Sequence, residues 1–210
     1  MNPPLHSMLH SMLRAMPALA GLALAAAQPS YAQQVGRVSG DASIATGAAV
    51  GARGAITVNQ AAGLNNAQAN QLTITSGDAV ANDNASVQSA SARARVPAAR
   101  AAIEGNAFSN SSGAVMVNQS AGAANLQRNS VQIGTAAAGV ETVPDGVLSA
   151  TAANNGGQGR AVAVPGAREA SISSDAFRNV NGIVQINQAA GAGNATANSF
   201  VLRPPAGTFF

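Results

Sequence analysis

The sequence predicts an all-β fold, a short β-solenoid or stack of β-arches built from three imperfect 31-residue repeats that irregular linkers join. One pattern occurs three times without gaps, at residues 44–74, 103–133 and 172–202. Within each copy, apolar and polar residues alternate with the two-residue period of a strand. The prolines beyond residue 32 all lie outside the copies: Pro97, Pro144, Pro165, Pro204 and Pro205. Because a fixed internal repeat is the signature of a stacked architecture, the three copies define the expected fold.

Residues 1–32 have the features of an export signal that is removed from the mature protein. Arg14 supplies a positive charge, and the apolar run at 19–27 is too short to cross a bilayer. Small residues at −3 and −1 predict cleavage after Ala32. The alternative, an N-terminal membrane anchor, fits less well because the run is rich in alanine and no stop-transfer flank follows it. Residues 33–43 then lead into the first repeat.

Removal of that segment leaves a chain without the side chains that most catalytic and metal sites need. His6, His10 and Tyr31 leave with it, and Cys, Trp and Lys do not occur. Zero cysteine excludes a disulfide framework and a thiolate metal site, and catalysis would depend on scattered carboxylates and serines. We therefore expect no enzyme and no cofactor. Ten of the eleven arginines remain against eight acids, without interleaved aromatic residues, which does not indicate nucleic-acid binding.

The first half of each repeat predicts a strand with two different faces. In the first copy Ile56, Val58 and Gln60 share one face, and Asn59 lies on the opposite face. An Ala-Gly bend at 62–63 separates this strand from a second alternating strand, which favours an arch over a hydrogen-bonded hairpin. The apolar positions of both strands are expected to stack from copy to copy: Ile56, Val58, Leu72, Ile74, Val115, Val117, Val131, Ile133, Val184, Ile186, Phe200 and Leu202.

Amide side chains recur at fixed offsets and predict ladders along the stack. If the copies are rungs about 4.8 Å apart, each amide lies over its equivalent, donating to one neighbour and accepting from the other. A shift of register would leave unpaired amides at a cost of about 1–3 kcal/mol each, so the ladders would also fix the register. The expected self-assembly ladder comprises Asn59, Gln60, Asn66, Gln68, Asn70, Asn118, Gln119, Asn125, Gln127, Asn129, Asn187, Gln188, Asn194 and Asn198.

Two other interpretations of the repeat stay open. Ala and Gln favour helices, whereas the β-branched residues at alternate positions and the regular Asn and Gly favour strands. Asn66 and its equivalents follow the bend directly and also fit a polar surface turn. The surface interpretation is weaker for Asn59 and Gln60, because two adjacent amides follow a β-branched pair at the same offset in every copy.

The two linkers, residues 75–102 and 134–171, contain most of the charged residues and the prolines that lie between repeats. Proline removes a ladder donor, and irregular glycine-rich sequence pairs poorly. We therefore expect the linkers not to form paired strands. Residues 203–210 make up a C-terminal tail.

The repeat reads Gly-x-h-x-h-Asn-Gln-x-Ala-Gly-x-x-Asn-x-Gln-x-Asn-x-h-x-h, where h is apolar and Thr196 replaces the later Gln in the third copy. This pattern, with two variable linkers behind an export signal, resembles the Fap-type functional amyloid subunits (FapB and FapC) of Gram-negative biofilms, as a distant relative that lacks their C-terminal Cys-x-x-Cys. The resemblance implies export through the periplasm with a periplasmic chaperone and an outer-membrane export pore. It also implies extracellular polymerisation, with itself and with related fibril subunits, into cross-β fibrils.

Two functional classes are compatible with the repeats. In the first, the chain is a secreted structural protein that adds to further copies, because an uncapped stack leaves strand edges unpaired at both ends. In the second, it is a monomeric secreted β-solenoid adhesin or binding module, with an end covered by Phe209 and Phe210. A membrane barrel fits poorly because three arches supply too few membrane-length strands, so no stable membrane insertion is expected.

Overall fold

The computed structural model describes residues 35–78, 80–82, 84, 86–136, 140–142, 148–154 and 166–203. Within these residues the chain forms strands and tight turns and no helix. The all-β class that the sequence predicts is therefore confirmed. The expected export signal with its cleavage site at Ala32, and the tail beyond Arg203, lie outside the described residues.

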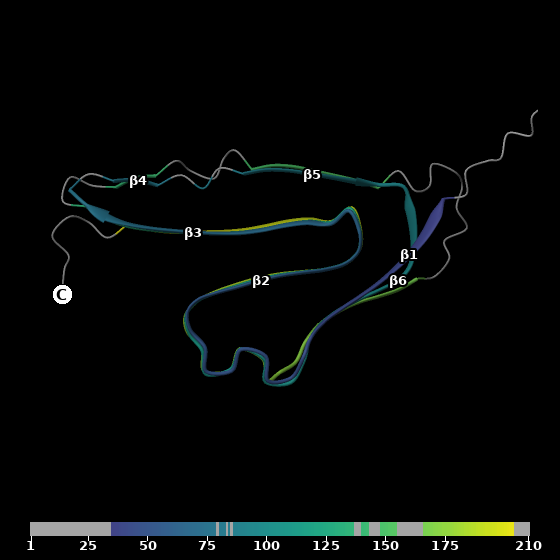
Figure 1. Ribbon diagram of the computed structural model, residues 1–210, viewed down its shortest axis with the longest axis horizontal. Coiled ribbons are helices and arrows are strands. Elements are labelled where there is room, and N and C mark those ends of the chain that lie inside the picture. Colours follow the sequence, from purple (N-terminus) through teal and green to yellow (C-terminus); the bar gives the residue numbers. More distant parts are fainter. Residues whose placement is uncertain are drawn as a thin grey trace, which may run out of the picture. The chain divides into compact units, whose positions relative to one another are not determined.

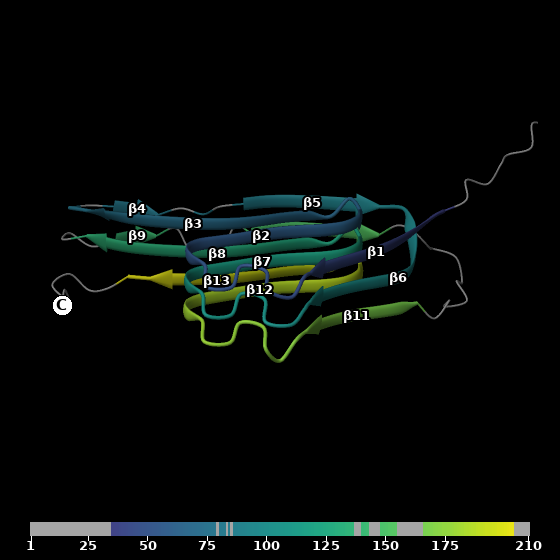
Figure 2. The same ribbon diagram turned by 60° about the horizontal axis from the view of Figure 1, so that its bottom comes forward.

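Three parallel sheets form the main part of the fold, and each takes one strand from each copy of the repeat. The first sheet contains β1 (Gly36–Ile44), β6 (Ala94–Ile103) and β11 (Ala167–Ile172). The second contains β2 (Arg53–Leu64), β7 (Ser112–Ala123) and β12 (Asn181–Ala192), and the third contains β3 (Ala67–Gly77), β8 (Leu126–Ala136) and β13 (Ala195–Leu202). We call β1–β3 rung 1, β6–β8 rung 2 and β11–β13 rung 3. The rungs eclipse one another in Figure 1 and separate into parallel layers in Figure 2.

Equivalent residues of the repeats form columns along the stack. Asn118 on β7 is paired with Asn59 on β2 and with Asn187 on β12, and the second and third sheets pair without any shift of register. The stacked parallel strands are those expected of a β-solenoid. The boundaries of the 31-residue units stay a prediction, since strands continue past them to Gly36 on one side and to Ala136 on the other.

An apolar core lies between the first and second sheets. It is next to the arc of turns that joins the two sheets in each rung, at residues 45–52, 104–111 and 173–180. Ile103, Val115 and Val117 of rung 2 are buried there around Phe108. The Phe108 ring stacks on Phe177 of rung 3, with ring centroids 4.9 Å apart and planes inclined by 8°. The core thus extends along the stack, and each rung covers the apolar side chains of the next.

Farther from this arc, alanine fills the space between the two sheets. Ala42, Ala101 and Ala121 are buried in one cluster of small side chains. The backbones approach so closely here that a Cβ on Gly40 would lie 2.6 Å from the carbonyl oxygen of Ala62. Because alanine buries little area, a single rung has a thin core and depends on its neighbours for stability.

The linkers do form paired strands, so the expectation that they would not is wrong. Parallel pairs join β4 (Val80–Asn82) to β9 (Val140–Thr142) and β5 (Ser86–Ala92) to β10 (Leu148–Asn154). The two linkers leave the third sheet and enter the first sheet at equivalent places in successive rungs, as Figure 1 shows. Their backbones are therefore brought side by side and can pair, although their sequences do not repeat.

Pro97 lies inside β6, where sequence reasoning places a linker. The pairing of β1 with β6 shifts between Arg37 and Ser39, so that Val38 faces both Val96 and Pro97. Such a bulge leaves one residue out of the ladder, which accommodates a residue that has no N–H to donate. The proline therefore interrupts the register locally without ending the strand.

Candidate functional site

Two asparagine ladders run side by side between the second and third sheets. Along the first, Asn118 Nδ2 donates to Asn59 Oδ1 at 3.0 Å, and Asn187 Nδ2 donates to Asn118 Oδ1 at 3.0 Å. Along the second, Asn129 Nδ2 donates to Asn70 Oδ1 at 2.9 Å, and Asn198 Nδ2 donates to Asn129 Oδ1 at 3.0 Å. The sequence places these residues at fixed offsets, and the parallel register turns the offsets into columns.

The two ladders also bond to each other across the arch. Asn70 Nδ2 donates to Asn59 Oδ1 at 3.0 Å, and Asn118 Nδ2 lies 3.0 Å from Asn70 Oδ1 and 2.8 Å from the carbonyl oxygen of Ala69. The same contacts recur one rung on, where Asn129 Nδ2 donates to Asn118 Oδ1 at 3.1 Å. Amide hydrogen bonds therefore hold this pair of sheets together.

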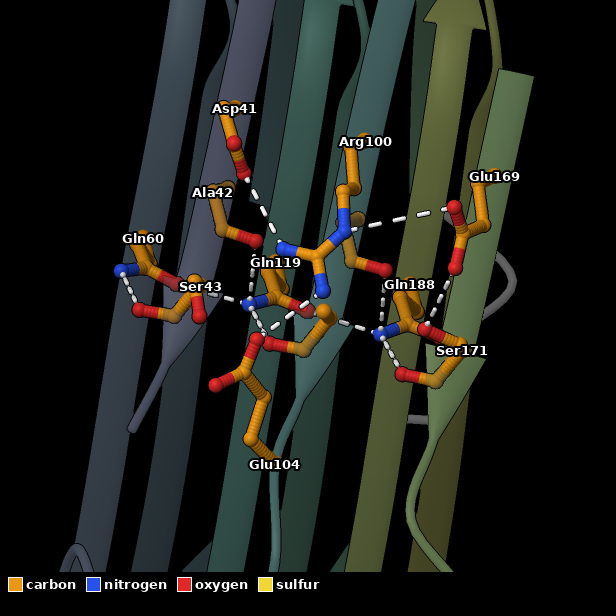
Figure 3. Close-up of polar contacts among 12 residues, drawn as sticks. Asp41, Ala42, Ser43, Gln60, Arg100, Glu104, Gln119, Glu169, Ser171 and Gln188 are labelled. Atoms are coloured by element: carbon orange, nitrogen blue, oxygen red, sulfur yellow. Dashed lines mark hydrogen bonds and ion pairs between the residues drawn. The ribbon is translucent and has the colours of Figure 1, made fainter. Parts of the chain in front are cut away.

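A glutamine ladder links the second sheet to the first. Gln119 Nε2 donates to Gln60 Oε1 at 2.7 Å, and Gln188 Nε2 donates to Gln119 Oε1 at 2.8 Å. Each amide also bonds to carbonyl oxygens of the first sheet, as Gln119 does to Ala42 at 3.1 Å and Gln188 does to Ser171 at 2.9 Å (Figure 3). The ladder therefore fixes the register along the stack and the position of one sheet against the other.

Asn66 and its equivalents form a fourth ladder just after the Ala-Gly bend. Asn66 Oδ1 accepts from Asn125 Nδ2 at 2.9 Å and from the backbone N–H of Asn125 at 3.0 Å. Asn194 donates in the same way to Asn125 Oδ1, through Nδ2 at 2.8 Å and through its backbone N–H at 3.2 Å. These residues therefore bond along the stack, where the sequence had left a polar surface turn as an alternative.

The Gln68 column differs from the other ladders. Gln68 Nε2 donates to Gln127 Oε1 at 2.8 Å, so the donor here is on rung 1 rather than on the higher rung. Gln127 in turn donates to the carbonyl oxygen of Gln119 at 2.9 Å. In rung 3 the column contains Thr196, which is paired with Gln127 in the strand register.

The expected apolar stack is most deeply buried in rung 2 and more exposed at the ends. Val115, Val117 and Val131 have no exposed surface, whereas Ile74 is 66% exposed and Leu202 is 45% exposed. Ile56, Val58 and Ile186 pack against the Phe108 core. Val184 and Phe200 of rung 3 are also exposed, by 39% and 36%, and Leu72 and Ile133 are half-buried.

Sequence reasoning missed a charge cluster on the first sheet. Arg100 on β6 is paired in register with Asp41 on β1 and with Glu169 on β11, and it also binds Glu104 at 2.9 Å. The signal that could have found it is the offset, because Asp41, Arg100 and Glu169 each stand three positions before the isoleucine that begins a repeat. The residues at this offset are not alike, because two are acidic and one is basic, so they do not show up as a repeat in the sequence.

Hydrogen bonding dominates the electrostatics of this cluster. The bond from Arg100 lowers the pKa of the Glu104 carboxyl, with a smaller contribution in the same direction from Ser43 and an opposing one from burial. The same bond raises the pKa of Arg100 against the effect of burial. Both side chains therefore stay charged at neutral pH.

Neither a metal site nor a membrane-spanning helix is found in the part of the chain that the structure describes. No three His, Cys, Asp or Glu side chains there are placed to hold a metal ion. No helix there is long and apolar enough to cross a membrane.

The ladders, the parallel register and the uncovered end rungs agree with one group of known proteins. A family model described as the functional amyloid protein FapB/FapC family matches residues 22–205. No solved structure matches the chain. The match covers all three rungs and both linkers, and the family is one of functional amyloid proteins, not of enzymes. The chain therefore belongs to the functional amyloid protein FapB/FapC family.

Proposed function

We propose that the chain is a secreted structural subunit whose copies add head to tail and form extracellular cross-β fibrils of a biofilm matrix. The observation that carries this proposal is the common direction of four amide ladders. In the columns of Asn59, Gln60, Asn66 and Asn70, the nitrogen of the higher rung always donates to the oxygen of the rung before it.

This common direction makes the two ends of the stack different and complementary. At the outer edge of rung 3, the amide oxygens of Gln188 and Asn194 lie where a further rung would donate to them. At the outer edge of rung 1, Asn59 and Gln60 lie where their N–H groups would meet the oxygens of a rung before them. Two copies therefore continue all four ladders only when rung 3 of one meets rung 1 of the other.

Rung 2 shows how deeply the amide and apolar side chains of a rung are buried when another rung covers it on each side. The amides of Asn118, Gln119 and Asn129 have no exposed surface, while at the edge Asn59 is exposed and Gln60 is half-buried. In the same comparison Val115 is fully buried and Val184, its equivalent at the other edge, is 39% exposed. Covering an end rung removes this apolar area from water, which favours addition of a further copy.

The strands at both ends of the stack have unpaired edges, so head-to-tail addition of copies can continue without closing. β1, β2 and β3 lie at one edge of their sheets, and β11, β12 and β13 lie at the other. Unpaired edges of parallel strands are templates for further strands. An interface between two different surfaces of one molecule does not close on itself, so it propagates a filament.

The route to the outside and the partners rest on the family and on the sequence. An export signal ending at Ala32 would direct the chain to the periplasm. The family membership supports a periplasmic chaperone, an outer-membrane export pore and related fibril subunits as partners. The sequence beyond Ala32 has none of the His, Cys, Lys or Tyr side chains on which catalysis usually depends, which supports a structural role.

A glycine at the rung 1 edge provides the test. A Cβ on Gly113 or Gly182 would lie 2.2 or 2.0 Å from the carbonyl oxygen of the equivalent glycine in the rung before it. Gly54 is the rung 1 member of this column, and no atom lies within 4 Å of its Cβ position. A methyl group there has room in one chain but would meet the backbone of Gly182 in a neighbouring copy. We expect Gly54→Ala to slow elongation of wild-type seeds by about tenfold or more, since each 1.4 kcal/mol of lost contact is a factor of ten.

Gly51→Asn is the matched control. Gly51 also has a positive φ, +68°, and an open Cβ position, but its equivalents Asn110 and Asn179 show that the column accepts a side chain. Wild type and Gly51→Asn should elongate alike and give cross-β diffraction, with unfolding midpoints confirming that both variants are folded. A wild-type chain that stays monomeric for days, as a capped binding module would, contradicts the proposal, as does Gly54→Ala elongating like wild type.

A further inference from the structure

One column of charged side chains alternates in sign along the stack of a single chain and has an acidic residue at both ends. Asp41, Arg100 and Glu169 are paired in register on β1, β6 and β11. Arg100 Nη1 lies 3.5 Å from Asp41 Oδ1, and Arg100 Nε lies 4.0 Å from Glu169 Oε2 (Figure 3). The column therefore reads acid, base, acid from rung 1 to rung 3, and it has a carboxylate at each end.

Two further arginines, Arg37 and Arg95, lie on this exposed face, but four positions from Asp41 on β1 and five positions from Arg100 on β6, about 13 Å or more along the strands. Among the described residues, Arg100 is the cation found paired with these acids. Arg100 also binds Glu104, so one arginine faces three carboxylates. The remaining groups around the column are uncharged, such as the Ser171 hydroxyl 3.3 Å from Glu169 and the amides of the glutamine ladder. Arg168, next to Glu169 on β11, is paired with the buried Ala99, and its stem lies beside the Gly191 backbone on the inner side of the sheet.

The acids meet when two copies stack. Head-to-tail addition in register places Glu169 of one copy beside Asp41 of the next, at the strand spacing of about 4.8 Å. Elsewhere the same junction brings like amide onto like amide, as in the Gln188 and Gln60 column. Like charges directly opposite on paired strands are destabilising.

We propose that the Glu169–Asp41 contact between copies is the least favourable part of the end-to-end interface and makes addition of copies dependent on proton uptake. This inference rests on the proposed head-to-tail assembly. In a single chain, Asp41 and Glu169 are separated by Arg100, whereas in the joined state each faces a further acid. The joined state therefore binds protons more readily than the separate chains, and addition strengthens as pH falls into the range where carboxylic acids take up protons, about pH 4.

The two acids can be neutralised one at a time. We expect Glu169→Gln and Asp41→Asn each to raise the rate of seeded elongation at pH 7 and low salt by about two- to fivefold, the range that corresponds to an exposed charge pair. The gain should shrink as pH falls towards 4, because protonation removes the same like-charge repulsion that the substitutions remove, and it should also shrink at 1 M salt, where the Debye length is about 3 Å.

Two carboxylates whose columns contain no second acid serve as controls. Asp175 lies on rung 3 but pairs with Arg178 in the arc that follows β11, and Glu104 lies on rung 2. Asp175→Asn and Glu104→Gln should not reproduce the combined pH and salt signature of Glu169→Gln. The proposal is overturned if Glu169→Gln and Asp41→Asn elongate like wild type at pH 7 and pH 4 while wild-type seeds grow normally. Wild-type seeds that recruit no further chain at either pH would instead refute head-to-tail assembly, and this inference with it.

Discussion

The side-chain nitrogen of Asn118 donates to Asn59 Oδ1 at 3.0 Å, although 59 positions separate the two residues in the chain. Asn118 Oδ1 accepts from Asn187 at 3.0 Å on its other side, and the side chain has no exposed surface. A buried amide in such a column is satisfied only while both neighbouring rungs are present. The asparagine column therefore couples three distant segments of the chain.

Replacing the middle amide should destabilise the whole stack. Asn118→Ala leaves the buried Asn187 and the carbonyl oxygen of the half-buried Ala69 each without one partner. We expect the free energy of unfolding to fall by about 2–3 kcal/mol, measured by chemical denaturation of the unpolymerised chain. Asn181→Ala, at the exposed start of β12, is the control and should change it by less than about 0.5 kcal/mol. Equal losses in the two variants would show that burial in the ladder does not matter.

The repeat pattern anticipated the strands that it contains, for a physical reason. Alternation in the first copy puts Val58 and Asn59 on opposite faces, and in the structure Val58 packs in the apolar core while Asn59 bonds to Asn70. Identical residues at identical offsets need only one register to pair, so the columns follow directly from the sequence.

The linkers could not be anticipated in the same way. Ser86–Ala92 and Leu148–Asn154 pair although they share no pattern, because the rungs fix where each linker leaves and returns. The charge column was hidden for a related reason, since Asp41 and Arg100 occupy one offset with opposite chemistry. In both cases position in the stack decides the contact, and residue identity does not reveal it.

The glycine column after Asn59 should tolerate a methyl group at the edge of the stack better than in its middle. A Cβ on Gly122 would lie 1.8 Å from the carbonyl oxygen of Gly191, whereas a Cβ on Gly191 meets only side-chain atoms, the nearest being Arg168 Cδ at 3.1 Å. Both residues have a positive φ, so alanine strains the backbone at either position. The two variants differ in whether the added methyl group also clashes with a neighbouring backbone. We expect Gly122→Ala to lose the cooperative unfolding transition and Gly191→Ala to keep it, as followed by circular dichroism. Similar losses would mean that strain, not close approach, requires these glycines.

The stability of a single chain should depend on pH through Glu104, with a sign opposite to that of assembly. A carboxyl whose pKa is lowered in the folded state adds stability above its ordinary value, here 4.5, and loses that contribution as pH falls through the folded value. Wild type should therefore be more stable than Glu104→Gln at pH 7, and the difference should shrink as pH falls below the ordinary value of the carboxyl. The difference will be small because Arg100 and Glu104 are both more than one-third exposed. Denaturation midpoints across this range provide the measurement, and a difference that is constant with pH would exclude the ion pair as its cause.

Head-to-tail addition in register is tested most directly by disulfide cross-linking, because the chain has no cysteine of its own. Ser43 on β1 and Ser171 on β11 both pair with Ala102, so they lie two rungs apart in one chain, about 9.6 Å, which is too far for a disulfide. In stacked copies, Ser171 of one chain would lie about 4.8 Å from Ser43 of the next, within disulfide range.

Oxidised fibrils of the double variant Ser43→Cys with Ser171→Cys should therefore give a ladder of covalent multimers on non-reducing gels. The control, Ser39→Cys with Ser171→Cys, places one thiol four positions along β1, about 13 Å out of the column, and should stay monomeric. Multimers in the first variant alone are the predicted result. Fibrils that give no multimers in the first variant, or the same multimers in both, would contradict head-to-tail stacking in register.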